Sequence, residues 1–294
     1  MPSAIKGIKR RFWTFKPFWN HRRNSIFGPK KELAVPHSSQ MHYRLIEDME
    51  RHGLDIEDFE INALEYQTYV RDAGELYAKY HLYHTLVRSH HFIEKSLEHF
   101  VAAQLLELES DDVYVDVASA RSPAPEIYHK LYGCTTYRQD MIYPDGIRGN
   151  VIGGNAAEMP LKDHFFTKMA LHCSFEHFED DSDIRFIKEA ARLLRTGGRL
   201  CILPLYLRDT YTIHTDPAVF TKQEMPPFEK DAVIYCARGY GNRHGRIYDI
   251  PHLIARIVNN MDAGLSLKIY NIQNAAQIDR YCYLEFAAIF EKGG

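Results

Sequence analysis

The spacing of apolar residues divides the chain into a mostly helical first part and an alternating second part. Residues 41–110 are expected to be helical, because 55–86 is rich in Glu, Ala, Leu, Tyr and Lys and contains no proline. The clearest helix is 96–108, whose apolar residues recur on one helix face: Leu97, Phe100, Val101, Leu105 and Leu108. The segment 41–110 is therefore interpreted as a helical cover that precedes the main domain.

From residue 111 onward the apolar pattern becomes that of short strands separated by helices. Residues 113–118 form a run rich in β-branched residues, which is typical of a buried parallel strand. Further strands are expected at 134–140, 151–152, 166–172, 199–205, 266–272 and 281–291, and helices at 123–131, 182–195 and 251–263. This alternation predicts a doubly wound α/β sheet that binds its ligand at the carboxyl ends of the strands.

Composition narrows the class of protein further. The chain has 294 residues, 45% of them hydrophobic, and no stretch approaches about 18 uninterrupted apolar residues, the length of a membrane span. Its five cysteines are scattered and none has CxxC spacing, which favours reduced thiols over a disulfide framework or a zinc knuckle. We expect a cytoplasmic protein.

Charge is distributed unevenly along the chain. The first 31 residues hold nine Lys or Arg and no acid, which leaves 27 basic and 39 acidic residues in the remainder. Six aromatic residues lie among these cations, so 1–40 is interpreted as a basic, aromatic N-terminal arm. Such an arm suits peripheral binding to an anionic membrane surface through 1–31. The alternatives are an arm packed on the domain and, less favoured, an arm that binds nucleic acid.

The N-terminal half is also rich in histidine. His81 and His84 have the i, i+3 spacing of two metal ligands on one helix face, but no third ligand lies at a matching offset. We therefore favour solvated or packed histidines and expect no metal site.

Four short motifs follow one another in a fixed order across the alternating part. They are GNAAEMPL at 154–161, FF at 165–166, SFEH at 174–177 and RLLRTGGR at 192–199. In order and spacing they resemble the small-molecule, type-11-like branch of the class I S-adenosylmethionine-dependent methyltransferases. The resemblance implies a mostly parallel, seven-stranded, Rossmann-like sheet over 111–294, closed by an antiparallel pair at 266–272 and 281–291, with S-adenosylmethionine as cofactor.

The resemblance also assigns residues to the cofactor's methionine part. The family's first motif is an acidic residue followed by two spaced glycines, and here it reads DVASARSP from Asp116. Ala118 and Ala120 stand where the glycines are expected, with Ser119 between them. Alanine adopts a positive φ less readily than glycine, so this departure bears directly on cofactor binding.

The remaining cofactor residues follow from the same resemblance. Asp140 is expected to hold the ribose hydroxyls and Asn155 to accept a hydrogen bond from the adenine amino group. Ala156 and Met159 are expected beside the adenine as apolar wall. His172, at the end of a strand, is expected to face both the methionine part and the acceptor.

Methyl transfer to a hydroxyl also requires a base, and histidine is the natural candidate because it can be neutral near pH 7. The candidates are His172, His177 and His244. The alternative for His172 is a strand-end residue bonded to backbone, and for His177 a structural role.

An insertion at about 206–249 is expected to select the acceptor, since such loops carry specificity in α/β folds. Its arginines can bind phosphate or carboxylate and its tyrosines can stack on a ring. The alternative is an arginine-rich surface hairpin paired with neighbouring acids. The expected acceptor-binding residues are Tyr206, His214, Arg238, Tyr240, Arg243 and Arg246.

These observations together predict an S-adenosylmethionine-dependent methyltransferase that O-methylates a small polar acceptor such as a sugar or a glycolipid. One alternative is N-methylation of a small amine, which needs no strong base. The other is a binding protein that kept the fold and lost catalysis, with the altered motif at 116–123 as its signature.

Overall fold

The computed structural model describes residues 25–29, 38–80, 90–221, 225–280 and 282–294. The candidate metal ligands His81 and His84 lie outside these residues, and within them no group of three or more His, Cys, Asp or Glu side chains could hold a metal ion.

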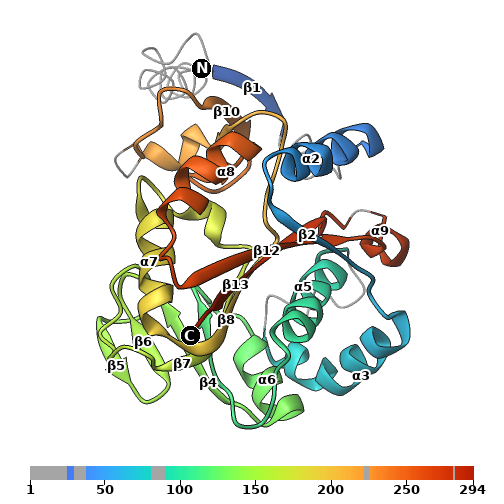
Figure 1. Cartoon of the computed structure of the whole chain (residues 1–294), viewed down its shortest axis with the longest axis vertical. Helices are drawn as coiled ribbons and strands as arrows, with labels where there is room; N and C mark the ends of the chain where they lie inside the picture. The colour runs from blue at the N-terminus through green and yellow to red at the C-terminus, as the bar shows by residue number, and fades with distance from the viewer. Residues whose placement is uncertain (1–24, 30–37, 81–89, 222–224, 281) are drawn as a thin grey trace, which may run out of the picture.

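The main sheet contains nine strands among the described residues (Figure 1). Their spatial order is β2 (Asp55–Phe59), β12 (Leu265–Ile272), β13 (Phe286–Lys292), β8 (Leu194–Leu203), β7 (Phe166–His172), β3 (Val113–Val117), β4 (Thr135–Asp140), β6 (Val151–Gly153) and β5 (Gly146–Arg148). All neighbours are parallel except β13, which is antiparallel to β12 and β8, and β5, which is antiparallel to β6. The seven predicted strands are therefore confirmed, with β2 and β5 added at the edges.

Helices cover both faces of this sheet, as the alternating pattern predicts (Figure 1). One face carries α3 (Ala63–Lys79), α5 (His90–Leu106) and α6 (Ala124–Tyr132), and the other carries α2 (Ser39–Arg51), α7 (Ser182–Leu193) and α8 (Ile250–Arg256). A short helix, α9 (Ala275–Ile278), precedes the last strand. No helix within the described residues is both long and apolar enough to cross a membrane.

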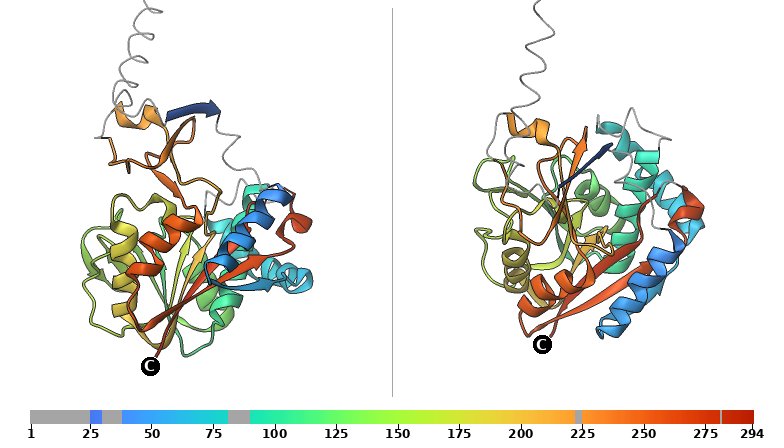
Figure 2. Two further views of the ribbon diagram at one scale, coloured as in Figure 1. Left: turned by 45° about the horizontal axis from the view of Figure 1, so that its top comes forward. Right: turned by 90° about the horizontal axis from the view of Figure 1, so that it is seen from above.

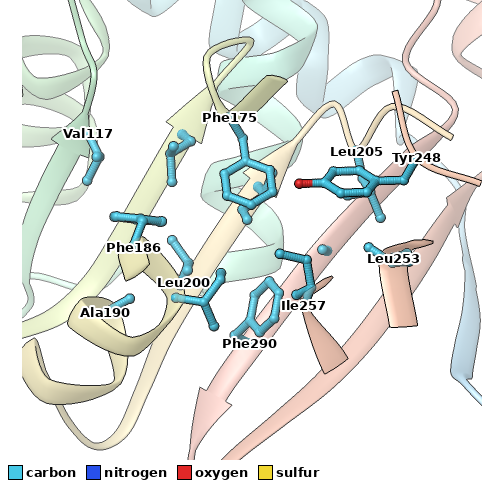
Figure 3. Close-up of a cluster of buried hydrophobic side chains, with 14 of the residues drawn as sticks. Val117, Phe175, Phe186, Ala190, Leu200, Leu205, Tyr248, Leu253, Ile257 and Phe290 are labelled. Atoms are coloured by element: carbon cyan, nitrogen blue, oxygen red, sulfur yellow. The ribbon is translucent and has the colours of Figure 1, made fainter. Parts of the chain in front are cut away.

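Each face of the sheet has its own hydrophobic cluster. Figure 3 shows part of the cluster beneath α7 and α8, where Phe186 and Phe290 pack between helix and sheet. Burial of each such side chain stabilises the fold by about 1.5–3 kcal/mol. Phe175, from the loop after β7, reaches the same cluster and stacks on Tyr248 of the insertion at 6.3 Å. The loop that follows β7 is thereby anchored to the core.

Strand β2 corrects the expectation of a wholly helical segment at 41–110. Ile56 and Phe59 are spaced as i and i+3, which also fits one face of a helix. In the strand they point to opposite faces of the sheet, and each packs on a different hydrophobic cluster. Pairing with β12 decides the structure, reinforced by an ion pair of 2.7 Å between Lys268 and Glu57.

The insertion at 206–249 builds a second, smaller sheet that stands above one end of the main sheet (Figure 2). Its order is β1 (Ser25–Pro29), β10 (Val233–Arg238), β9 (Thr212–Thr215) and β11 (Gly245–Ile247), with short helical turns at η4 (Pro217–Thr221) and, beyond the insertion, η5 (Val258–Asn260). The N-terminal arm thus contributes β1, an edge strand parallel to β10. Residues 1–24 of the arm lie outside the described residues, so membrane association through 1–31 stays a prediction.

Several element boundaries differ from the expected ones. Helix α7 ends at Leu193 and β8 begins at the next residue, before the two glycines expected to separate them. Gly198 is required by close packing, because a Cβ there would lie 3.0 Å from the Thr167 carbonyl oxygen. Helix α8 stops at Arg256, and β13 begins only at Phe286.

Candidate active site

The loop that follows β3 lies at the carboxyl edge of the sheet and is held by side chains of β4. Gln139 accepts a hydrogen bond from the Ala118 N–H at 3.2 Å and donates one to the Gly154 carbonyl at 2.6 Å. Asp140 accepts a hydrogen bond from the Ala120 N–H at 2.6 Å. These contacts join the loops after three neighbouring strands, β3, β4 and β6. Gln139 was not anticipated from the sequence, because a lone amide in a strand gives no signal.

The two alanines of this loop adopt the backbone conformation expected of glycine. Ala118 has φ 50° and Ala120 has φ 46°, both in the left-handed region. This conformation costs an alanine roughly 1–2 kcal/mol. Ser119 between them donates its N–H to the Gln139 carbonyl at 2.9 Å, and its hydroxyl is buried without a partner among the described residues. The loop therefore keeps a glycine-like backbone despite the substitutions.

Asp116 is the chemically most unusual residue of the loop region. Its side chain is fully buried, and neither carboxylate oxygen has a hydrogen-bond partner among the described residues. Burial raises the pKa of Asp116 to about 7, and the nearby Ser122 hydroxyl and Arg138 charge offset only part of this rise. A buried carboxylate without donors is unfavourable, so this position calls for a cation or donor. The positively charged amino group of S-adenosylmethionine fits it.

The expected adenine-side residues are only partly accessible. Asn155 is exposed, but its side-chain oxygen already accepts a hydrogen bond from the Ala157 N–H at 3.0 Å. Ala156 and Met159 are buried in the core, so they support the loop from beneath rather than line an open wall.

Asp140 is followed by two apolar residues that sequence reasoning missed. Met141 is 78% exposed and Ile142 is 61% exposed, which is unusual for large apolar side chains beside a polar loop. Asp140 itself also accepts a hydrogen bond from the Ile142 N–H at 2.9 Å. The two side chains offer an apolar surface on which the face of a flat aromatic ring can pack. The signal in the sequence is the apolar pair directly after the acidic strand end.

His172 lies at the end of β7, between helix α5 and the loop 118–123 that follows β3, here called the cofactor loop. Its Nε2 is 4.0 Å from the Asp116 carboxylate and 3.3 Å from the Tyr114 hydroxyl. Its ring meets that of His99 edge-on at 4.7 Å. Burial, with the charge of Lys95, lowers the pKa of His172 to about 3. The residue is therefore neutral and a weak proton acceptor.

The other two candidate histidines come together in the structure. His177 is one-third exposed and donates from Nδ1 to the His244 carbonyl at 2.6 Å. His244 is buried, its Nε2 has no partner among the described residues, and burial lowers its pKa to about 3. The ring of Tyr240 lies 6.4 Å from that of His177 and 6.2 Å from that of His214. Burial also lowers the pKa of His214 to about 3.

The arginines of the insertion do not line the site as expected. Arg246 is completely buried and binds Asp183 at 2.9 Å and Glu229 at 2.6 Å, so no part of it faces an acceptor. Arg243 is paired with Glu179 at 2.6 Å. Arg238 is exposed at the end of β10, next to β1 in the small sheet. Pairing partners distant in the sequence thus give Arg246 a structural role, which corrects the expected acceptor contact.

Sequence reasoning named only Tyr206 from a largely buried group of polar side chains, here called the polar cluster: Glu94, Lys95, Glu98, Cys173, Glu176, Tyr206 and Tyr283. Lys95 Nζ binds the two oxygens of Glu98 at 2.8 and 3.0 Å. Cys173 Sγ lies 3.4 Å from Glu176 Oε1 and 3.3 Å from the Tyr206 hydroxyl. The available signal was the run of charges at 94–98, at the start of an otherwise apolar helix.

The polar cluster adjoins the cofactor loop. Cys173 directly follows His172, which contacts Asp116. Ser174, the next residue, donates from its hydroxyl to the Val117 carbonyl at 3.5 Å. The carboxyl edge therefore holds a loop suited to the cofactor and, beside it, a polar group of side chains.

Comparison with known proteins identifies the class. Residues 97–202 match a family model described as a methyltransferase domain, and this range runs from α5 to β8 across the whole cofactor loop. The match makes residues 97–202 a methyltransferase domain, the class of domain that uses S-adenosylmethionine. No curated protein matches the chain in sequence.

Two solved structures illustrate the similarity of fold. One is 1,6-didemethyltoxoflavin-N1-methyltransferase of Burkholderia thailandensis with bound S-adenosylhomocysteine, at 13% identity over 81% of this chain and 94% of that chain, with a TM-score of 0.48. The other is phosphoethanolamine N-methyltransferase 1 of Haemonchus contortus, at 10% identity over 79% of this chain and 50% of that chain, with a TM-score of 0.47. Similarities at this level do not identify the acceptor of this chain.

Proposed function

We propose that this chain transfers a methyl group from S-adenosylmethionine to a small polar acceptor at the carboxyl edge of the main sheet. The observation that carries the proposal is Asp116, a buried carboxylate without a hydrogen-bond partner among the described residues, beneath a loop whose alanines keep a glycine-like backbone. The acceptor would lie between this loop and the polar cluster.

Methyl transfer requires little covalent chemistry from the protein itself. When bound, the cofactor supplies an electrophilic methyl group on a positively charged sulfur. The chain's own residues then have to orient the nucleophile and exclude water. Tyr206 and Tyr283, whose rings lie 5.8 Å apart, can exclude water on the acceptor side.

O-methylation of a sugar or glycolipid is the first candidate within this function. A hydroxyl acceptor needs a base, and His177 is the accessible one of the three histidines. The support expected from the insertion is weaker than the sequence indicates, because Arg246 and Arg243 are engaged with Asp183 and Glu179.

N-methylation of a small amine is the second candidate. A neutral amine attacks without a strong base, so the low pKa values of the buried histidines are no obstacle. The observation that favours this candidate is the excess of carboxylates in the polar cluster, which is developed in the next subsection.

The proposal is tested by calorimetric titration of the full chain with S-adenosylmethionine and S-adenosylhomocysteine. We expect heat on mixing and thermal stabilisation for the wild type. Asp116→Asn should bind both at least about tenfold more weakly, because the amide cannot neutralise the ligand's amino group.

Asp111→Asn, an exposed carboxylate just before the same strand, is the matched control and should bind like the wild type. If the wild type bound neither compound, the proposal would be wrong. Binding without turnover on any acceptor would instead favour the non-catalytic binding protein.

A further inference from the structure

The polar cluster contains more acidic than basic side chains. Its three acidic side chains are Glu94, Glu98 and Glu176, and its one basic side chain is Lys95. His177, outside the cluster, places its Nε2 3.6 Å from Glu176 Oε1. Lys95 Nζ is committed to Glu98, and it lies 3.7 Å from the nearest oxygen of Glu94. The cluster therefore lacks positive charge in a place where water is largely excluded.

Two carboxylate oxygens of the cluster are buried and have no hydrogen-bond partner among the described residues. They are Oε1 of Glu94, whose side chain is 9% exposed, and Oε2 of Glu176, whose side chain is 7% exposed. An unpaired buried carboxylate oxygen forfeits its hydration and is unfavourable. Two of them in one cluster, next to the cofactor loop, indicate a position that a ligand completes.

The electrostatics of the cluster agree with this geometry. Burial raises the pKa of Glu94 above its ordinary value, and the charge of Lys95 only partly opposes it. Burial raises the pKa of Glu98 as well, and the charges of Glu94 and Glu176 raise it further. A cation placed among these groups would lower all of these values and so bind favourably.

We propose that the polar cluster binds the ammonium group of the acceptor, with Glu94 and Glu176 as its direct partners, so that the methylated substrate is a small amine. This inference rests on the proposed methyltransferase function and specifies its acceptor. Tyr206 and Tyr283 add aromatic rings beside the bound cation, and their hydroxyls lie 3.3 and 3.9 Å from Cys173 Sγ.

The same carboxylates account for the proton that the reaction must move. A primary or secondary amine binds as its ammonium form and gives one proton to a carboxylate of the cluster. Its nitrogen lone pair then attacks the methyl carbon of the cofactor; the N–C bond forms, the C–S bond breaks, and sulfur keeps the electron pair. The product leaves as a methylated ammonium ion.

The test compares a cation with a neutral molecule of nearly the same size. Ethanolamine hydrochloride and ethylene glycol are each added at pH 7.5 to the full chain saturated with S-adenosylhomocysteine, with NaCl matching the ionic strength. Ethanolamine should raise Tm by about 2–4 °C at saturation, and ethylene glycol should not. An equal response to both probes would overturn the inference.

Variants locate the binding position. Glu94→Gln and Glu176→Gln should each lose most of the ethanolamine shift, while Glu75→Gln, an exposed glutamate on α3, should keep it. A shift that persists in the double variant Glu94→Gln, Glu176→Gln would place the cation elsewhere. Binding of S-adenosylhomocysteine by the wild type is measured separately. If the chain does not bind it, the proposed methyltransferase function is wrong. If the chain binds it but does not respond to ethanolamine, only the proposed amine acceptor is wrong.

Discussion

Ala118 and Ala120 replace the two glycines of a motif and still adopt the backbone conformation of those glycines. Their positive φ values place them where glycine is favoured, and hydrogen bonds from their N–H groups to the side chains of Gln139 and Asp140 hold them there. The strain is local, and the neighbouring strands of the sheet compensate for it.

This strain predicts an unusual response to substitution at Ala120. Replacing a helical alanine by glycine destabilises a protein by up to about 1 kcal/mol, whereas at a positive φ glycine removes a cost of roughly 1–2 kcal/mol. Ala120→Gly should therefore leave the free energy of unfolding unchanged or raise it. Ala78→Gly, at an exposed position of helix α3, should lower it. Chemical denaturation measures both, and an equal loss in the two variants would contradict the strain argument.

At the scale of elements, the insertion sheet is fastened to the core by a buried ion network. Asp183 on α7 binds Arg246 from β11 at 2.9 Å and Arg256 from α8 at 2.7 Å, and the Tyr248 hydroxyl donates to it at 2.6 Å. Burial alone would raise the pKa of Asp183, but its partners outweigh burial and lower it. The network fixes the small sheet to helices α7 and α8.

Replacing Arg246 and replacing Arg243 should therefore lower the free energy of unfolding by very different amounts. Arg246→Met removes one partner of a buried network and should lower the free energy of unfolding by about 3–5 kcal/mol. Arg243→Met removes a pair whose side chains are each 30% exposed and should change it by no more than about 1 kcal/mol. Urea denaturation of both variants checks this, and comparable losses would show that burial does not separate the two roles.

At the scale of the whole molecule, buried ionisable groups link stability to pH in opposite directions. His172, His214 and His244 have pKa values near 3 in the folded state, below the ordinary 6.5. Their contribution to stability is complete above pH 6.5 and is lost as pH falls toward 3. Asp116 acts oppositely: its raised pKa contributes stability that is complete below about pH 4 and is lost as pH rises from about 4 through about 7.

Substitution of His214 isolates the contribution of one histidine to the pH dependence of stability. His214 lies in the small sheet, and between pH 7.5 and 5.5 it should account for about 1 kcal/mol of lost stability. In His214→Asn the fall in unfolding free energy over this range should be smaller by that amount. The exposed His52→Asn variant is the control. Identical pH profiles for the wild type and His214→Asn would mean that His214 is not kept neutral by burial.

Much of the fold could be predicted because its signals are local. The β-branched run before Asp116 and the apolar face at 96–108 specify a strand and a helix from neighbouring residues alone. Strand β2 could not be predicted in this way, because Ile56 and Phe59 suit either structure until β12 supplies the pairing partner. The same limit hid the roles of Glu94 and Glu176, which join one cluster only when α5 packs beside β7.

By itself the sequence determined the alternating architecture, and it predicted the carboxyl edge as the binding position and the loop after Asp116 as the cofactor loop. These depend on periodicity and on residues a few positions apart. Only the tertiary structure decided which charges are paired. Arg246 is neutralised by Asp183, 63 positions earlier in the chain, while oxygens of Glu94 and Glu176 are left buried without a hydrogen-bond partner among the described residues. Pairing depends on distances between side chains in the folded chain, and local sequence does not fix those distances.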